Sequence, residues 1–252
     1  MITFVCYTHS DYKDIWPLVF GQIKKYVNIP KVLFVNKNEE TIDNIFDKII
    51  YYDDALTYPC KLMFLCDNID TKYISLVHDN DIVMNFYNDL CYQYVNDMDK
   101  NNIDRLMFGV IKKRENESYY TRATRGCTTH FLTPYDVGPS IWKVDSLKDI
   151  MSHFTHCTYR QIENDSIQYY CESKYNMCGL VSDCNSKYSI GRPFTSNFAF
   201  CHILCQGKWM ENPLYMDYSN ILPQLLKEYN IDINNRGLLL HQDHINVNFR
   251  DV

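Results

Sequence analysis

The sequence predicts a mixed α/β fold with a mainly parallel central sheet flanked by helices. Short apolar segments alternate with segments of helical periodicity through the first half of the chain. The apolar segments lack a polar face, as in Tyr73-Ile-Ser-Leu-Val77, which is typical of strands covered on both sides. Such an alternation implies parallel strands joined by right-handed crossovers. Ligands of these sheets bind outside the carboxyl ends of the strands.

Each element follows from its own periodicity. In the first half, strands are predicted at residues 2–8, 31–36, 48–52 and in the apolar run that starts at residue 73. Helices are predicted at residues 11–26, 39–46, 56–69 and 85–99. In the second half we predict strands at residues 105–112, 178–183 and 198–205, and helices at residues 145–154, 165–175 and 219–229. The polar residues 113–135 form a long predicted binding loop.

Composition narrows the class of protein. With 252 residues, 46% of them hydrophobic and 22% charged, the chain suits one globular domain. Its formal net charge of −6 argues against nucleic acid as a partner, because a polyanion requires clustered Lys and Arg. The sequence lacks an apolar run of about 18 residues that could span a membrane, and its first residues lack the features of a signal peptide. We therefore expect a soluble, cytoplasmic protein whose 11 cysteines are mostly free thiols.

Asp79 and Asp81 are the first candidates for a functional site. They form an Asp-X-Asp pattern at the end of the fourth predicted strand, on the edge where the loop of residues 8–12 also opens. Two carboxylates one residue apart can hold a divalent cation and, through it, the diphosphate of an activated donor. The alternative is an Asx-rich turn, since Asp and Asn are common wherever a strand ends. The adjacent His78 is expected to pack or to form hydrogen bonds.

Glu163 and Asp165 form a second acidic group, at the predicted start of a helix. In the functional interpretation, one of them accepts the proton of an acceptor hydroxyl that attacks the anomeric carbon of a sugar. A carboxylate suffices because the hydroxyl becomes more acidic as the bond forms, while a metal ion takes up charge on the departing diphosphate. In the structural interpretation, Asp165 or Asn164 caps the helix and the acidic groups offset its dipole.

Several later positions suit either chemistry or packing. His202 lies in an apolar predicted strand, where a histidine is usually a core residue but can also be a metal ligand. Lys208 follows a glycine and could contact a phosphate, and Trp209 could stack on a sugar, or both could be ordinary surface and core residues. Trp142, next to a tight turn, offers the same choice between a saccharide face and the core. The segment His241-Gln-Asp-His244 is a competing metal candidate.

These motifs, in this order, resemble those of GT-A-fold glycosyltransferases, and most of all the small soluble ones encoded by large DNA viruses of algae and protists and by some bacteria. The resemblance spans nearly the whole chain and rests on Val5-Cys-Tyr-Thr-His-Ser10, residues 73–84 with Asp79-Asn-Asp81, Pro139-Ser-Ile-Trp142, Ile162-Glu-Asn-Asp165 and His202 followed by Gly207-Lys-Trp209. It implies a single GT-A-like (Rossmann-like) catalytic domain over residues 1–252. Residues 1–112 would be its nucleotide-sugar-binding half, and residues 113–252 its acceptor-binding half.

The resemblance also implies a donor site. The loop after the first strand is expected to contact the nucleoside, through Thr8, His9, Ser10 and Asp11. Asp79 and Asp81 are expected to hold Mn²⁺ or Mg²⁺, with Asp81 the more direct ligand. His202 is expected to be a further metal ligand, and Lys208 to lie near the phosphates of the donor.

The acidic pair Glu163 and Asp165 matches the motif that supplies the base in inverting members of the family. Its Glu-Asn-Asp order departs from the family's adjacent acidic residues, so the sequence leaves open which carboxylate is the base. The chain also lacks the membrane anchor of Golgi members, which fits a cytosolic enzyme of viral or bacterial type.

The sequence thus predicts a metal-dependent hexosyl- or pentosyltransferase that moves a sugar from a UDP- or GDP-linked donor to a hydroxyl of a glycan, glycoprotein or other acceptor, with inversion. If the protein is viral, its location is the host cytoplasm. One alternative is a metal-dependent phosphohydrolase, whose one or two ions would be surrounded by His78, Asp79, His241, Asp243 and His244. Another is a non-catalytic nucleotide- or saccharide-binding protein. The sequence specifies neither the sugar nor the acceptor nor the oligomeric state.

Overall fold

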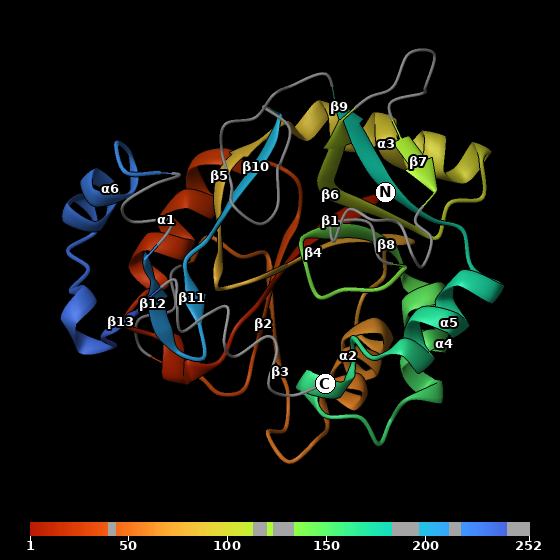
Figure 1. The fold of residues 1–252 in the computed structure, drawn as a ribbon, viewed down its shortest axis with the longest axis horizontal. Helices are drawn as coiled ribbons and strands as arrows, with labels where there is room; N and C mark the ends of the chain where they lie inside the picture. Colours follow the sequence, from red (N-terminus) through yellow and green to blue (C-terminus); the bar gives the residue numbers. More distant parts are fainter. Residues whose placement is uncertain (40–43, 113–119, 123–133, 183–196, 212–217, 241–252) are drawn as a thin grey trace.

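The computed structural model describes residues 1–39, 44–112, 120–122, 134–182, 197–211 and 218–240. Within these residues, the centre of the fold is an eight-stranded sheet in the order β3-β2-β1-β4-β8-β6-β9-β7 (Figure 1). Its strands are Ile2–Tyr7 (β1), Lys31–Val35 (β2), Lys48–Tyr51 (β3), Tyr73–His78 (β4), Arg105–Lys112 (β6), Tyr120–Arg122 (β7), Ser140–Lys143 (β8) and Met177–Ser182 (β9).

The sheet is mostly parallel. β3, β2, β1 and β4 run in the same direction, and β6 is parallel to β9. β8 is antiparallel to both of its neighbours, β4 and β6, and β7 is antiparallel to β9 at the edge. The predicted mixed α/β fold with a mainly parallel central sheet is therefore confirmed. Strands from residues 140–182 continue the sheet that residues 2–112 begin, so both halves of the chain build it.

Helices cover both faces of the sheet and enclose two cores. Trp16–Tyr26 (α1), Asn88–Lys100 (α3) and Leu222–Glu228 (α6) contribute to one core, and Tyr58–Asp67 (α2), Val144–His153 (α4) and Asp165–Lys174 (α5) contribute to the other. The central strand β4 serves both, because Tyr73 and Val77 enter the first core while Ile74 and Leu76 enter the second. This is why its sequence has no polar face.

Two smaller sheets lie on the α1 side (Figure 1). After a turn at residues 79–80 the chain continues as Asp81–Phe86 (β5), which pairs with Phe198–His202 (β10) in antiparallel fashion. Leu204–Cys205 (β11), Lys208–Met210 (β12) and Leu238–Leu239 (β13) form a second small sheet, in which β12 is the middle strand. The β5–β10 pair brings residues around 200 to the end of β4.

Local sequence explains several element boundaries. A 3₁₀ turn at Ser10–Tyr12 precedes α1, and Pro residues occupy the first turns of α1, α2 and α6, where a missing N–H is tolerated. The N-cap of α5 is Asn164, whose side chain accepts a hydrogen bond of 3.1 Å from the N–H of Ile167.

Most predicted elements are present, with shifted ends. The helix predicted at residues 85–99 begins only at residue 88, because residues 81–86 form β5. The strand predicted at residues 198–205 is divided into β10 and β11, because the N–H of Ile203 bonds Asn80 O instead of a strand partner. The strand β5 and the short strands β7, β8, β12 and β13 were not predicted. Most of the helix predicted at residues 39–46 and of the loop at residues 113–135 lies outside the described residues, and residues 44–45 form a turn.

A buried arginine fixes the segment that leads into β8. Arg105, at the start of β6, is fully buried and donates a hydrogen bond of 3.1 Å from Nε to Ser140 Oγ. Its guanidinium forms an ion pair with Asp136 and lies 4.7 Å from the ring centroid of Trp142. A buried charge requires such partners, so this network ties residues 135–142 to the sheet.

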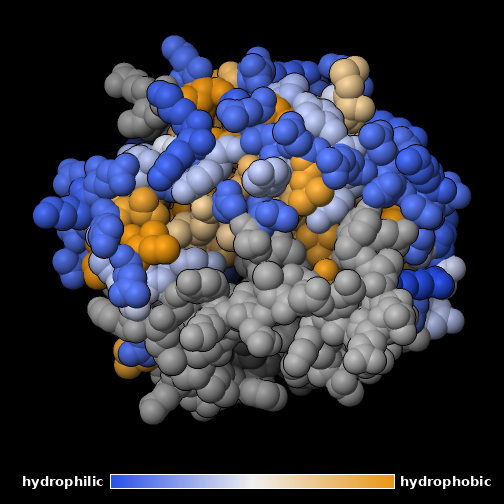
Figure 2. Space-filling model, turned by 90° about the horizontal axis from the view of Figure 1, so that it is seen from above, coloured by the Kyte–Doolittle hydropathy of each residue, from blue (hydrophilic) through white to orange (hydrophobic). Residues whose placement is uncertain are grey.

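The outer surface gives no sign of a membrane span in the part of the chain that the structure describes. No helix there is both long enough and apolar enough to cross a bilayer. Seen from above, the described surface is largely hydrophilic, with small apolar patches between polar side chains (Figure 2).

Candidate functional site

The loops after β1 and β4 meet at the carboxyl edge of the central sheet. Tyr7 and His78 are register partners at the ends of these parallel strands, so Thr8 and Asp79 follow side by side. The Thr8 hydroxyl donates a hydrogen bond of 2.5 Å to Asp79 Oδ2 and accepts one of 2.7 Å from Trp16 Nε1. The Asp79 carboxylate is therefore held between a strand end and the start of α1.

Asp79 and Asp81 are nearly buried, with 7% and 5% of their surface exposed. Burial raises the pKa of Asp79 from its usual 3.8 to about 6. Hydrogen bonds from the Thr8 hydroxyl and the His9 backbone act in the opposite direction, while the charge of Asp81 adds to the rise. At neutral pH two negative charges lie close together with little solvent around them. A bound cation would offset both.

Asp81 lies next to His202. The two residues are register partners of β5 and β10, and His202 Nδ1 is 2.9 Å from Asp81 Oδ1. The N–H of Ile203 donates a hydrogen bond of 2.8 Å to Asn80 O, which fixes the chain after β10 against the turn between the two acidic residues. The structure thus brings together two side chains that are 121 positions apart in the sequence. Their role as metal ligands stays a prediction.

The donor atoms of Asp79, Asp81 and His202 suit Mn²⁺ or Mg²⁺, which prefer carboxylate oxygens, with imidazole an accepted partner for transition metals. Within the described ranges, however, no three His, Cys, Asp or Glu side chains converge closely enough to hold a metal ion. Asp79 contacts Thr8 instead of the other two. A complete set of ligands would therefore need a movement of Asp79 or oxygen atoms from water or a bound diphosphate.

A polar cluster next to Thr8 in the sequence joins the loops after β1, β2 and β3. Asn36 Nδ2 donates a hydrogen bond of 2.8 Å to Asp54 Oδ2, and it lies 3.1 Å from His9 Nε2. Asp54 Oδ2 also lies 3.1 Å from His9 Nε2, and Asp54 forms an ion pair of 3.3 Å with Lys61. Partial burial acts to raise the pKa of Asp54, but the hydrogen bonds from Asn36, His9 and Lys61 outweigh it and lower the pKa. Sequence reasoning missed Asn36 and Asp54, although Asn36 is the last residue of one predicted strand and Asp54 follows the next predicted strand, and both strands end at this edge.

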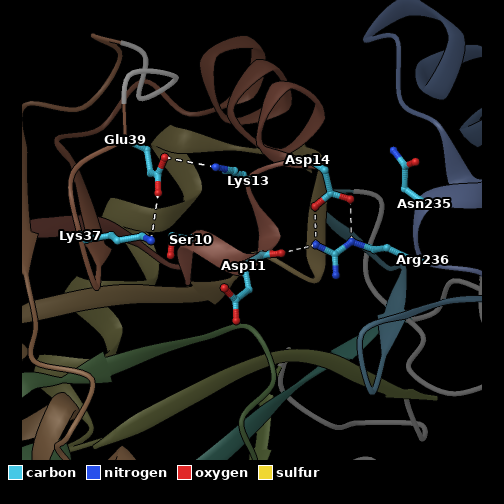
Figure 3. Close-up of a pocket in the computed structure, with 8 residues that line it drawn as sticks. All are labelled: Ser10, Asp11, Lys13, Asp14, Lys37, Glu39, Asn235 and Arg236. Carbon is cyan, nitrogen blue, oxygen red and sulfur yellow. Dashed lines mark hydrogen bonds and ion pairs between the residues drawn. The ribbon is translucent and has the colours of Figure 1, made fainter.

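A hollow with a volume of about 480 Å³ opens beside the loop after β1 (Figure 3). It is lined by Ser10, Asp11, Lys13, Asp14, Lys37, Glu39, Asn235 and Arg236. Two of the four predicted nucleoside contacts, Ser10 and Asp11, thus line an open space, while Thr8 and His9 are engaged in the contacts described above. Ser10 is nearly buried, and its hydroxyl accepts a hydrogen bond of 3.1 Å from Asn36 Nδ2. Contact of all four with a nucleoside stays a prediction.

Arg236 crosses from the C-terminal part of the chain to the same loop (Figure 3). It forms a bidentate ion pair with Asp14 and donates a hydrogen bond of 2.5 Å to Asp11 O. Its guanidinium also lies 4.6 Å from the ring centroid of Tyr12. No local sequence pattern marks Arg236, so sequence reasoning missed it. It fastens the wall of the hollow to the rest of the fold.

Lys208, Trp209 and Trp142 were proposed to contact the donor or a saccharide, and only Lys208 is exposed enough to do so. Lys208 is exposed at the start of β12, after Gly207, whose φ of +76° favours glycine in this hairpin turn. Trp209 and Trp142 are both buried, and Trp142 lies against Arg105. The suggestion that either tryptophan offers a face to a sugar is therefore wrong, and the core interpretation is confirmed.

Glu163 and Asp165, the acidic pair in the second half of the chain, have different surroundings. Glu163 Oε1 accepts a hydrogen bond of 2.7 Å from the N–H of Val137. Asp165 is exposed in the first turn of α5, while Asn164 caps the helix, as the structural interpretation allowed. Burial raises the pKa of Tyr58, and the nearby charge of Glu163 contributes to the rise. Glu163 is thus near the α2 side of the sheet edge, and its role as a base stays a prediction.

His78 packs and forms a hydrogen bond, as expected: its Nε2 lies 3.0 Å from the hydroxyl oxygen of Tyr58. The phosphohydrolase alternative needed it beside residues of His241-Gln-Asp-His244. That segment lies outside the described residues, so the metal site proposed there is not tested.

No protein-family model matches the sequence, and no curated protein matches it. Solved structures do match in three dimensions. The chain is similar to S. aureus TarS 1-349 in complex with UDP-GlcNAc, with a TM-score of 0.46 and 12% identity over 71% of this chain and 56% of that one. It is similar to a cytidylyltransferase from Leptospira borgpetersenii, with a TM-score of 0.46 and 10% identity over 77% of this chain and 81% of that one.

A third similar structure is 4-diphosphocytidyl-2C-methyl-D-erythritol synthase from Anaerococcus prevotii, with a TM-score of 0.43 and 10% identity over 72% of this chain and 86% of that one. The chain spans little more than half of the TarS 1-349 chain. At such identities and TM-scores, likeness does not establish what the chain does, and the residues of the site carry the argument for function.

Proposed function

We propose that the chain is a metal-dependent glycosyltransferase that moves a sugar from a UDP- or GDP-linked donor to a hydroxyl of a glycan or other acceptor, with inversion. The observation that carries this proposal is the nearly buried pair Asp79 and Asp81 at the carboxyl end of β4, with His202 beside Asp81. Ligands of α/β sheets bind at this edge. A diphosphate can lie against two carboxylates only if a cation neutralises them.

In the proposal, the nucleoside lies along the loops after β1, β2 and β3. These loops form a continuous polar edge from Asn36 and Asp54 to Thr8, which contacts Asp79. The lowered pKa of Asp54 keeps its carboxylate ionised, so it can accept a hydrogen bond from an N–H group of a nucleobase. Asp11, which is exposed, would contact the nucleoside from the wall of the hollow.

A bound divalent cation would stabilise the negative charge that develops on the departing diphosphate. Asp81 and His202 would bind it, and Thr8 holds Asp79 in position. Lys208, exposed on its hairpin, would contact a phosphate oxygen. Each of these groups acts on the leaving side of the sugar.

The base acts on the opposite side of the sugar. Glu163 or Asp165 would accept the proton of the acceptor hydroxyl as its oxygen attacks the anomeric carbon and the bond to the diphosphate breaks. Asn164 fixes the start of α5 and thereby the backbone between the two acidic residues. Exchanging each carboxylate for its amide tests this role: one of Glu163→Gln and Asp165→Asn should leave nucleotide binding intact and remove transfer. The assignment is wrong if neither impairs turnover.

Ligand-induced stabilisation tests the donor site. In the presence of Mn²⁺, UDP or GDP should raise the melting temperature of the protein, while a simple phosphoester such as p-nitrophenyl phosphate should not. Hydrolysis of the phosphoester would favour a phosphohydrolase. Release of UDP or GDP from a nucleotide sugar, even slowly and to water, would separate an enzyme from a binding protein.

The reaction also needs to be separated from nucleotidyl transfer, because one of the similar structures is named as a cytidylyltransferase. The protein is incubated with UTP or CTP, a sugar phosphate and Mg²⁺, and pyrophosphate is measured. A glycosyltransferase produces none. Pyrophosphate release that depends on the sugar phosphate would overturn the proposal.

Asp81→Ala tests the cation site directly. Because Asp81 is nearly buried beside His202, its loss should abolish the stabilisation that UDP gives in the presence of Mn²⁺. Asp70→Ala is a matched control, since Asp70 is exposed in the loop before β4. Unchanged metal-dependent binding in Asp81→Ala would show that Asp81 is not a ligand.

A further inference from the structure

An aromatic cluster occupies the opposite side of β4 from Asp79. His78, the last residue of β4, has its ring centroid 5.1 Å from that of Tyr7 and 6.0 Å from that of Tyr58. Tyr159 meets Tyr58 edge to face, with centroids 4.9 Å apart, and lies 6.2 Å from His78. Because successive residues of a strand point to opposite faces, His78 joins this cluster on the α2 side while Asp79 turns toward Trp16 of α1.

Tyr159 is both fixed in place and exposed. It begins a 3₁₀ turn, Tyr159–Gln161, whose start is held by a capping box between Thr158 and Gln161. The next residue, Ile162, is fully buried and anchors the turn to the core. Even so, 44% of the surface of Tyr159 is exposed. The turn also leads directly into Glu163, one of the two candidate bases.

A pre-positioned tyrosine of this kind suits a sugar ring. The apolar C–H face of a sugar packs against an aromatic ring, and tyrosine provides this contact with little loss of conformational entropy. The two tryptophans that the sequence suggested for this role, Trp142 and Trp209, are buried in the core. Tyr159 is an exposed aromatic residue beside His78 at the end of β4, and it lies shortly before Glu163 in the sequence.

The geometry of an inverting transfer indicates that the acceptor binds near Tyr159 and Glu163. In an inverting transfer, the nucleophile attacks the anomeric carbon from the side opposite the leaving group. The diphosphate would leave toward Asp79 and Asp81, on the α1 side of β4. The acceptor must therefore arrive from the other side, where Tyr159 and Glu163 lie.

We propose that Tyr159 is the platform for an acceptor saccharide, whose ring packs on it while the attacking hydroxyl faces Glu163 or Asp165. This inference rests on the proposed glycosyltransferase function. It defines the acceptor class as a saccharide, in contrast to a lipid or a protein side chain. It also makes Tyr159 a specificity-determining residue that does not touch the nucleotide.

A matched control is available at Tyr92. Its exposed fraction, 43%, is almost equal to that of Tyr159. Tyr92 lies on α3. The first residue of this helix, Asn88, forms hydrogen bonds with the backbone of residues 26 and 28, which precede β2. Near its other end, Asp99 accepts a hydrogen bond from Tyr73 at the start of β4. Helix α3 is therefore at the amino edge of the sheet, away from the site.

The test measures saccharide binding directly. Saturation-transfer NMR is recorded for methyl glycosides of glucose, galactose and N-acetylglucosamine with wild type, Tyr159→Ala, Tyr159→Phe and Tyr92→Ala, in the presence of Mn²⁺ and UDP. At least one glycoside should give a signal that Tyr159→Ala removes and that the other two variants keep. For an acceptor found in this way, Tyr159→Ala should raise KM about tenfold, which corresponds to ~1.4 kcal/mol. The stabilisation by UDP and Mn²⁺ should be the same in Tyr159→Ala and wild type.

The binding measurements distinguish a wrong role for Tyr159 from a wrong proposed function. If no glycoside signal depends on Tyr159, the platform is excluded, whatever the result with nucleotides. If Tyr159→Ala weakens binding of a nucleotide sugar but not of UDP, then Tyr159 holds the donor sugar and the acceptor assignment is wrong. If wild type binds neither UDP nor GDP with Mn²⁺, the proposed function itself fails, and a remaining Tyr159-dependent glycoside signal would identify a saccharide-binding protein.

Discussion

Replacing Asp79 by asparagine should stabilise the metal-free protein at neutral pH while it damages the donor site. Burial raises the pKa of Asp79 from 3.8 to about 6. The folded state therefore binds the proton more tightly than the unfolded state does. The favourable contribution of this group is complete below pH 4 or so and is lost as the pH rises through about 6. At 1.36 kcal/mol for each pKa unit, a rise of about two units means that the ionised carboxylate costs the fold ~3 kcal/mol at pH 8.

Asparagine has nearly the same shape, can still accept the hydrogen bond from Thr8, and carries no charge to bury. We expect Asp79→Asn to raise the free energy of unfolding by up to ~3 kcal/mol at pH 8 and by little at pH 4. Urea denaturation with EDTA present, followed by circular dichroism between pH 4 and pH 8, measures this difference. Asp70→Asn, at an exposed carboxylate, is the control and should follow wild type. Added Mn²⁺ should stabilise wild type at pH 8 but not Asp79→Asn.

Two results would refute this reasoning. Parallel stability curves for wild type and Asp79→Asn across the whole pH range would mean that the Asp79 carboxylate is not penalised by burial. A loss of stability at pH 8 would mean that the ionised form is already compensated in the metal-free fold, and the case for a cation at this place would lose its main physical support.

Three further substitutions test the network that builds the site, each by urea denaturation. Arg105→Met should cost ~3–5 kcal/mol, since it removes the cation that pairs with the largely buried Asp136, and Asp136→Asn in the same chain should recover part of the loss. Arg236→Lys should cost ~1 kcal/mol, because lysine cannot make the bidentate contact with Asp14. Asn164→Ala should cost ~1 kcal/mol through the lost cap of α5. Wild-type stability in any of them would contradict the corresponding contact.

The parts of the fold that the sequence could predict are those with strong local signals. The run before Asp79 is apolar on both faces because β4 contributes to two cores, and this is visible in the sequence alone. The carboxyl-edge position of Asp79 follows from the same alternation of strands and helices. The start of α5 was also predictable, because Asn164 is a strong capping residue just before a helical pattern.

What the sequence could not predict depends on contacts between distant segments. β8 has only four residues and follows Gly138 and Pro139, which are typical of a turn. It is nevertheless a central strand, because it pairs with both β4 and β6. The spacing of His202 alone left open whether it is a core residue or a metal ligand, and the resemblance favoured a ligand. Its position beside Asp81 depends on the antiparallel pairing of β10 with β5, which no local pattern predicts. Tyr159 has no motif of its own, because its position beside His78 arises from tertiary packing.

Arg236 makes the shape of the hollow depend on a distant part of the chain. It binds Asp14 across 222 positions of sequence and also bonds the backbone of Asp11 in the same loop. The strands of the central sheet lie within residues 2–182, so the segment that carries Arg236 adds none of them. Loss of this contact would therefore open one wall of the hollow without removing a strand of the central sheet.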